Sequence, residues 1–529
     1  MEGSVRGGLD DTPEYDVVVI GGSLAGAGTA TVLLRDRPGL RVLILERSPK
    51  FGRRVGEATV EVSAFFLCRV LGLTSHLNEH HLVKQAMRFW FSSERAHSLD
   101  QCSELGSLYQ VRLPAFQVDR STLDEEVLRR AAALGATVVR DAPVADVELV
   151  PGGTQVVRLR RSGVADDGGQ PSAVRCRWVI DASGHAALLA RRYGWWRSNG
   201  AHPTAAVWAR FTGVGDWDGL ELARKFPEWS RACYTTRGTA TNHLTGDGWW
   251  AWLIPLKGGD VSVGLVFDQR RLSWPPPGSN GADTGELLLA FLRAHPVGRE
   301  LLTAAQPVEG DVHVRRNLAY SSTTYAGDGF ALVGDAAAFL DPLYSPGMDW
   351  ISYTAYATAE LVGAQLAGQD ITAHLERHNR RFRQSYQRWF DAVYRDKYEY
   401  LGEYDLMRTA FVLDLGLYYM GIVEQPFRRG ATALSEPTFS RPSSVPFYHL
   451  MSLYNARLAT IARARRERGA LGRTNDRRRT MLPGFKLSAT SGFGLLRGLA
   501  RWGSLELSEG WRTWLRAPDA PASADSVQA

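Results

Sequence analysis

Cysteine is scarce in this sequence, with 4 cysteines among 529 residues. They lie far apart and form no CxxC pair, so we expect neither a disulfide scaffold nor a zinc site. This usage fits a reducing compartment, and the cytoplasm is the expected location.

Long hydrophobic runs are also missing. The first residues lack the apolar core of a signal peptide, and no uncharged stretch reaches the roughly 18 apolar residues of a membrane span. The nearest run, 409–423, is interrupted by Asp414. It predicts a buried helix, with membrane contact as the lesser alternative.

Charge is nearly balanced: 62 Lys+Arg against 56 Asp+Glu leave a net charge of +6. So small an excess for this length argues against a nucleic-acid partner. The basic residues are concentrated in 462–479, where we expect a solvated helix face and loop. The alternative is a surface for an acidic partner or a membrane.

A nucleotide-binding turn is predicted near the N-terminus. The segment YDVVVIGGSLAGAGTATVLLRD, residues 15–36, has the pattern of a strand, a glycine turn and a helix. In it, Gly21 permits the turn and Gly26 allows close helix packing, although Ser23 replaces the middle glycine of GxGxxG. A second strand ends at Glu46, whose carboxylate suits a ribose hydroxyl. The residues expected to hold the dinucleotide here are Gly21, Gly22, Ser23, Ala25, Gly26 and Glu46.

Three later segments identify the dinucleotide. The segments CRWVIDASGH (176–185), GFALVGDAAAFLDP (329–342) and FQVDRSTLDEEVLRRAAALGATVV (116–139) resemble signatures of the FAD-dependent monooxygenase superfamily, of the para-hydroxybenzoate hydroxylase type. The resemblance implies FAD, with Asp335 at the ribityl chain and Arg120 near the phosphates. One glycine-rich turn is apparent, so NAD(P)H binds transiently or a separate flavin reductase supplies reduced FAD.

Two further motifs are similar to those of flavin-dependent halogenases. WAWLIP (250–255) matches WxWxIP and FLDPLYSPG (339–347) matches FxxPxxSxG, while Lys84 follows GEATVEV where that family has its essential lysine. The resemblance implies that reduced FAD, O2 and a halide, chloride or bromide, yield hypohalous acid, which Lys84 relays to the substrate. It also implies a role in natural-product biosynthesis, including that of antibiotics.

The remaining site residues follow from these motifs. Trp250 and Trp252 should share one face of a strand and form a wall between flavin and substrate. Ser345 belongs to the Ser-x-Gly segment, and Gly347 and Met348 are the expected N–H donors to halide and flavin. The x position is Pro346, which has no N–H, and the halide site departs from the family there.

The substrate class is indicated by Tyr344, because tryptophan halogenases have a glutamate at that position. An electron-rich aromatic, phenol-like or pyrrole-like and either free or tethered to an acyl or peptidyl carrier protein, is expected. The alternatives are an FAD-dependent hydroxylase or related oxidoreductase without halide chemistry, and a catalytically idle flavoprotein.

The predicted fold is α/β. A discontinuous Rossmann-type FAD-binding domain (14–365) would hold an antiparallel substrate-side sheet, mainly from 200–320, and a helical C-terminal region would follow (366–516). Residues 1–13 and 517–529 have the composition of disordered tails.

Overall fold

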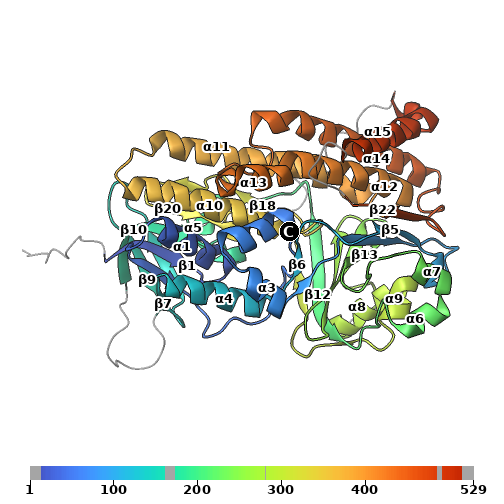
Figure 1. Cartoon of the computed structure of the whole chain (residues 1–529), viewed down its shortest axis with the longest axis horizontal. Helices are drawn as coiled ribbons and strands as arrows, with labels where there is room; N and C mark the ends of the chain where they lie inside the picture. Colours follow the sequence, from blue (N-terminus) through green and yellow to red (C-terminus); the bar gives the residue numbers. More distant parts are fainter. Residues whose placement is uncertain (1–13, 161–172, 280, 485–490, 515–529) are drawn as a thin grey trace, which may run out of the picture.

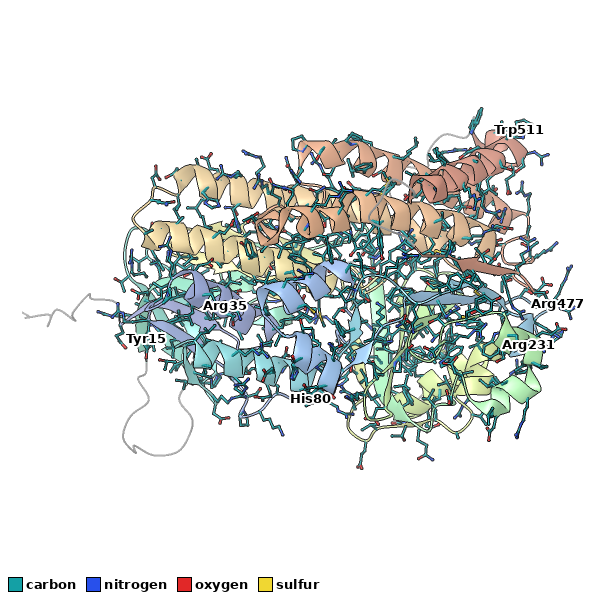
Figure 2. The ribbon with its side chains drawn as sticks, in the orientation of Figure 1. Tyr15, Arg35, His80, Arg231, Arg477 and Trp511 are labelled. Atoms are coloured by element: carbon teal, nitrogen blue, oxygen red, sulfur yellow. The ribbon has the colours of Figure 1, made fainter. Side chains whose placement is uncertain are left out.

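The computed structural model describes residues 14–160, 173–279, 281–484 and 491–514. The predicted tails, 1–13 and 517–529, lie outside the described residues. The described chain is elongated, and Tyr15 and Trp511 lie at opposite ends of it (Figure 2).

An eight-stranded sheet forms the nucleotide-binding half of the molecule. Its central strands are parallel, and each is a short apolar run that is buried on both faces. The path of the sheet is β19 (Ala326–Gly327), β20 (Phe330–Leu332), β10 (Ala173–Asp181), β1 (Tyr15–Ile20), β2 (Val42–Leu45) and β7 (Thr137–Val139), with β8 (Val144–Glu148) and β9 (Gln155–Leu159) beside it. The strands therefore come from separate parts of the chain, as the sequence motifs at 15–46, 176–185 and 329–342 indicated.

Three helices pack beside this sheet. The N-terminal ends of all three line one cavity, through Ala25, Arg120 and Gly347. Helix α1 (Leu24–Asp36) packs against both α4 (Arg120–Ala133) and α10 (Gly347–Leu366). Small residues along α1 are fully buried, which permits this close packing. The arrangement brings the glycine turn and the start of α10 together, because Ser23 and Gly347 line one cavity.

A second sheet of nine strands forms the other half. Its path is β16 (Gln306–Pro307), β12 (Thr204–Thr212), β15 (Val261–Asp268), β14 (Trp249–Pro255), β13 (Thr241–Gly246), β4 (Met87–Phe91), β5 (Ser103–Ser107) and β22 (Arg479–Leu482), with β17 (His313–Arg315) beside β12. The sequence prediction of an antiparallel sheet holds for β12 to β15, but β13 pairs with β4, and β5 with β22, in parallel. The sheet thus also contains β4, β5 and β22, which come from well outside 200–320.

The tryptophan strand shows the period-two alternation that the sequence predicted. Trp250 and Trp252 belong to the core that the nucleotide half shares, whereas Ala251 and Leu253 belong to a separate core beneath the second sheet. Gly264 on the neighbouring strand leaves room for one of these rings, because a Cβ there would lie 2.2 Å from Trp252.

Helices from the C-terminal part of the chain form a layer above both sheets (Figure 1). They are α11 (Thr372–Trp389), α12 (Tyr404–Tyr418), α13 (Glu424–Arg429), α14 (Val445–Glu467) and α15 (Ser491–Ser508). Within the described residues one helical run, Tyr404–Arg429, is long and apolar enough to cross a membrane, but 67% of its most apolar window is buried inside the protein. This burial agrees with the core helix expected at 409–423.

The basic segment 462–479 is not a free cationic surface. Arg465 pairs with Glu403 and Glu509, and Arg466 pairs with Asp247 and Glu399. Further along, Arg478 pairs with Asp405. Several arginines of this segment are therefore paired with carboxylates of the protein itself, which weakens the argument for an acidic partner there.

A buried ion pair lies inside the helical layer. The Lys397 ammonium donates to Asp414 at 2.7 Å and to Asn455 at 3.1 Å, and its side chain has no exposed surface. Asp414 also accepts hydrogen bonds from Tyr344 and Tyr454. The aspartate that interrupts the apolar run therefore compensates a buried positive charge.

We expect Asp414→Asn to destabilise the protein by roughly 3–5 kcal/mol, because it leaves the Lys397 ammonium buried without a counterion. Urea unfolding followed by circular dichroism measures the loss. The matched control is Asp405→Asn on the same helix, whose arginine partners are partly exposed and whose loss should cost about 1 kcal/mol or less. Equal stabilities for the two variants would contradict the structural role given to Asp414.

Candidate active site

An elongated cleft runs along the carboxyl ends of the parallel strands. It consists of two adjoining cavities, of about 410 Å³ and 520 Å³, which share lining residues that include Ser23, Arg54 and Ser183. Clefts at this edge of a doubly wound sheet are where dinucleotides bind.

The glycine turn fits close to the cleft for steric reasons. Gly21 has φ +98°, and a Cβ on it would lie 2.5 Å from the carbonyl oxygen of Ala182. A Cβ on Gly26 would lie 1.9 Å from the carbonyl oxygen of Gly21. Neither position tolerates a side chain, as the sequence pattern predicted.

The N–H groups of this turn are used differently from the sequence expectation. Gly22 donates its N–H to the Glu46 carboxylate at 2.8 Å, and Leu24 donates to Asp124 at 3.1 Å. Gly22 therefore orients Glu46 and does not offer its N–H to a pyrophosphate. Ser23 and Ala25 do line the larger cavity, while Glu46 lines the smaller part of the cleft.

The larger cavity brings together the residues expected at the flavin. Arg120 and Asp335 both line it. The Arg120 guanidinium donates to both oxygens of Asp124, at 3.2 and 3.1 Å, and it is thereby fixed in direction.

Sequence reasoning missed His185, although it directly follows the Asp-Ala-Ser-Gly motif. Its Nε2 lies 3.4 Å from the Asp335 carboxylate, and its Nδ1 lies 2.8 Å from the Tyr320 hydroxyl. Burial lowers the pKa of His185, which favours the neutral imidazole beside the cavity.

The loop before α10 has an uncommon backbone. Tyr344 and Ser345 have φ values of 69° and 58°, in the left-handed region that residues other than glycine rarely adopt. The Ser345 N–H donates to the Pro342 carbonyl at 3.0 Å. Helix α10 begins directly afterwards, at Gly347.

Free N–H donors lie at the start of this helix. Gly347 and Met348 line the larger cavity, and neither N–H has an acceptor among the described residues. The first turn of a helix carries unpaired N–H groups and partial positive charge, which suit an anion. Pro346 also lines this cavity but contributes no N–H.

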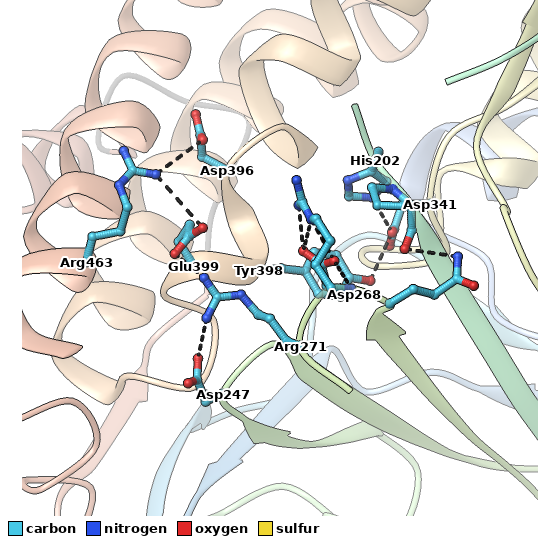
Figure 3. A network of polar contacts seen from close by, with 12 residues as sticks. His202, Asp247, Asp268, Arg271, Asp341, Asp396, Tyr398, Glu399 and Arg463 are labelled. Atoms are coloured by element: carbon cyan, nitrogen blue, oxygen red, sulfur yellow. Dashed lines mark hydrogen bonds and ion pairs between the residues drawn. The ribbon is translucent and has the colours of Figure 1, made fainter. Parts of the chain in front are cut away.

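Buried hydrogen bonds from several elements hold the loop in place. Asp341 accepts from the Leu343 N–H at 2.9 Å, from His202 at 2.7 Å and from the Tyr398 hydroxyl at 2.9 Å. His202 and Tyr398 approach Asp341 in Figure 3. The Tyr394 hydroxyl donates to the Leu343 carbonyl at 3.0 Å, so the residues 390–398 reach the loop twice.

A third cavity, of about 110 Å³, contains Lys84. The side chain follows the short strand β3 (Leu82–Val83) and is buried, and its ammonium donates to the Thr59 carbonyl at 3.0 Å. Burial lowers the pKa of Lys84 to about 8, although the nearby carboxyls of Glu61 and Asp349 oppose the shift. Lys84 is thus a buried amine that lines a cavity, not a surface lysine.

The Lys84 cavity and the larger cavity meet at one residue. Among the described residues, Pro346 alone lines both. Trp250 and Trp252 line the larger cavity but not the one around Lys84, so the predicted tryptophan wall is misplaced. The strand register aims both rings at the nucleotide half, and the partition is formed by Pro346 instead.

The tryptophans are nonetheless fixed in position. Trp250 donates its indole N–H to the Tyr398 hydroxyl at 2.9 Å, and Trp252 donates to Ser262 at 3.1 Å. Their ring centroids are 5.8 Å apart. They form a rigid aromatic floor beside Ser345, Gly347 and Met348.

The residues present fit FAD. The cleft provides a glycine turn that no Cβ could enter and the Glu46 carboxylate, and its larger cavity adds a fixed arginine, an aspartate, aromatic side chains and helix N–H donors. The family described as tryptophan halogenase matches residues 92–398, more than half of the chain. The chain belongs to the tryptophan halogenase family.

Curated relatives agree with this assignment. The flavin-dependent halogenase chlA of Dictyostelium discoideum is 27% identical over 84% of this chain and 76% of its own length. The flavin-dependent halogenase armH3 of Armillaria mellea is 28% identical over 67% of this chain and 68% of its own length. The 1H-pyrrole-2-carbonyl-[peptidyl-carrier protein] chlorinase of Pseudomonas fluorescens is 24% identical over 76% of this chain and 86% of its own length.

Solved structures share the fold. Halogenase PltM in complex with phloroglucinol and FAD has a TM-score of 0.70 at 19% identity and covers 93% of this chain and 96% of its own. The sequence prediction is confirmed: this protein is an FAD-dependent halogenase with a Rossmann-like fold, and FAD and a halide are its expected co-reactants.

We expect Gly26→Ala to abolish flavin binding, because its Cβ would collide with the Gly21 carbonyl and displace the turn. The absorbance of flavin retained after purification measures binding. Gly28→Ala is the matched control: its Cβ on the same helix would meet Phe66 at an ordinary 3.5 Å, so flavin should be retained. Normal flavin retention by Gly26→Ala would mean that the cofactor does not use this turn.

Proposed function

We propose that this protein halogenates an electron-rich aromatic substrate in the cavity that contains Lys84, with an oxidant that is generated in the larger cavity. The observation that carries the proposal is the meeting of the two cavities at Pro346. A large organic molecule in the Lys84 cavity is kept apart from the cofactor in the larger cavity. A small oxidant needs only to pass Pro346 to reach it.

The protein's part in the chemistry is positioning and relay. FAD, when it is bound and reduced, would supply two of the electrons that reduce O2, and the halide would supply the other two and thereby be oxidised to hypohalous acid. Gly347 and Met348 offer N–H groups to the halide at the start of α10, and the floor formed by Trp250 and Trp252 limits the access of water on that side. Ser345 connects this anion site to the loop that carries Pro346.

Lys84 lies on the far side of the partition. Its amine is available either to hydrogen-bond hypohalous acid or to form a haloamine. Both routes place the halogen inside the Lys84 cavity, within reach of a bound ring. Both also require that the lysine be shielded from bulk water. The burial of Lys84 and its lowered pKa support this role.

The lining of the Lys84 cavity supports an aromatic substrate. Most of it is apolar, with aromatic and branched side chains that include Phe411, Trp389 and Leu415. Tyr344 occupies the position where the resemblance places a glutamate in tryptophan halogenases. A phenol-like or pyrrole-like ring fits such walls better than a zwitterionic amino acid.

We extend the proposal to partners. A separate flavin reductase is the proposed source of reduced FAD, because one glycine-rich nucleotide turn is apparent in the sequence. A carrier protein that presents the substrate remains a second candidate partner, since one relative acts on a pyrrole bound to a peptidyl carrier protein. We place this protein in the cytoplasm, without contact with nucleic acid or membrane.

Reactions with FAD, a flavin reductase, NADH and O2 should convert members of a phenol, pyrrole and indole panel to halogenated products. Mass spectrometry should show chlorine or bromine isotope patterns that vanish when halide is omitted. Products that are heavier by one oxygen, whatever the halide, would overturn the proposal in favour of hydroxylation.

Lys84→Met should reduce halogenation by at least about 100-fold, as expected for the loss of a group that takes part in the chemical step. Flavin binding and NADH consumption should persist, because Lys84 does not line the larger cavity. Product yield by mass spectrometry is the measurement.

The matched control is Lys257→Met, a surface lysine that donates to the Glu79 carbonyl and should leave the product yield unchanged. Near-normal halogenation by Lys84→Met would remove the relay role.

A further inference from the structure

Besides Asp414, which pairs with Lys397, two carboxyls line the Lys84 cavity: Glu61, in the GEATVEV segment, is half-buried, and Asp349 is buried. Glu61 begins α2 (Glu61–Phe65), and Asp349 lies in the first turn of α10. They come from segments far apart in the sequence, and α2 packs against α10. The fold thus brings one acidic group from each helix to the cavity in which Lys84 lies.

Specific hydrogen bonds orient both groups. One oxygen of Asp349 accepts the Ser63 N–H at 2.8 Å, and the other accepts the Tyr418 hydroxyl at 3.1 Å. Glu61 accepts a hydrogen bond from the hydroxyl of Tyr419. Two adjacent tyrosines of one helical segment therefore hold two carboxyls that face one cavity.

The environment favours one proton on the pair near neutral pH. Burial, with a smaller contribution from the charge of Glu61, raises the pKa of Asp349 to about 7 against the opposing hydrogen bonds from Ser63 and Tyr418. Burial also raises the pKa of Glu61, opposed by Tyr419 and by the charge of Lys84. Two like charges in a buried site resist ionising together, so one carboxyl stays protonated while the other is ionised.

We propose that Glu61 and Asp349 act together as the acid and the base of the halogenation step: one takes the proton that the substrate ring loses, and the other protonates the atom that the halogen leaves. The proposal rests on the proposed function and assigns to this cavity the proton transfers that aromatic substitution requires.

The step balances for either form of the relay. The ring carbon bonds to the halogen as the halogen–oxygen bond of hypohalous acid, or the halogen–nitrogen bond of the Lys84 haloamine, breaks. The electron pair of the broken bond stays on oxygen or nitrogen, which accepts the proton of the neutral carboxyl. The ring then loses its C–H proton to the ionised carboxyl and recovers its aromatic electrons. The pair ends with one proton, as it began, and water or the free amine is released.

If the two carboxyls had a purely structural role, their replacement would slow halogenation without producing an isotope effect at the ring C–H bond. Asp349 also accepts the Ser63 N–H, so its loss could disturb α2 without any role in proton transfer. Asp349→Asn keeps the shape of the side chain and an oxygen for that N–H, and Glu61→Gln does the same at the other position. A readout that follows the C–H bond itself separates the two roles.

The test uses a phenol that the wild-type protein halogenates, with deuterium at the position that becomes halogenated. In the wild-type protein, ring deprotonation follows a slower step, and the rates for the two isotopes should be equal. In Asp349→Asn and Glu61→Gln, halogenation should slow by about 100-fold, the usual worth of acid–base catalysis, and the deuterated phenol should react measurably more slowly than the protiated one.

The matched control is Glu403→Gln, which neutralises another buried carboxyl that pairs with Arg465 and lines none of the three cavities. It should show no isotope effect, whatever it costs in stability. Halogenation within a few-fold of wild type in both cavity variants, or slow halogenation with no isotope effect, would overturn the proposal. Absence of any halide-dependent product from the wild-type protein would instead overturn the proposed function.

Discussion

The backbone of residues 341–346 is the constraint on which the active site depends. Two successive residues, Tyr344 and Ser345, lie in the left-handed region, where each costs of the order of 1 kcal/mol or more. Such a conformation persists only when its surroundings over-determine it, and here buried carboxylates do so. Asp341 pins the start of the loop, and Asp414 accepts the hydroxyl of Tyr344 at 3.1 Å. Only with this bend does α10 begin where its free N–H groups line the flavin cavity.

This constraint gives the helical layer above the two sheets a role in the active site. The groups that hold the loop, Tyr394, Tyr398 and Asp414, come from segments that follow the last motif of the family, and Lys397 compensates the charge of Asp414. The helices therefore do more than cover the substrate cavity. They supply the hydrogen bonds that keep the partition between the two cavities in one conformation.

The sequence predicted the features that follow from local backbone rules. Gly21 and Gly26 were predictable because a strand-turn-helix leaves no room for a Cβ, and Trp250 and Trp252 share a face because strands alternate. Which cavity that face meets depends on the packing of one sheet against another, and no local pattern contains that information. The joint placement of Glu61 and Asp349 could not be predicted for the same reason, since it depends on the packing of α2 against α10. The arginines of 462–479 lie largely at the surface, as the sequence predicted, but their ion pairs were not predictable because the carboxylate partners lie in distant parts of the sequence.

Pro346 departs from the family motif in the sequence, but the backbone conformation at this position suits a proline. At the residue before α10 its missing N–H removes no helical hydrogen bond, and its φ of −74° is close to the value that the proline ring imposes. Pro346 offers no N–H to the cavity, while Gly347 and Met348 keep theirs. In return, the residue at which the two cavities meet cannot rotate about its N–Cα bond. Under the proposed function this stiffness matters, because a small oxidant must pass Pro346 while an aromatic ring is retained beside it.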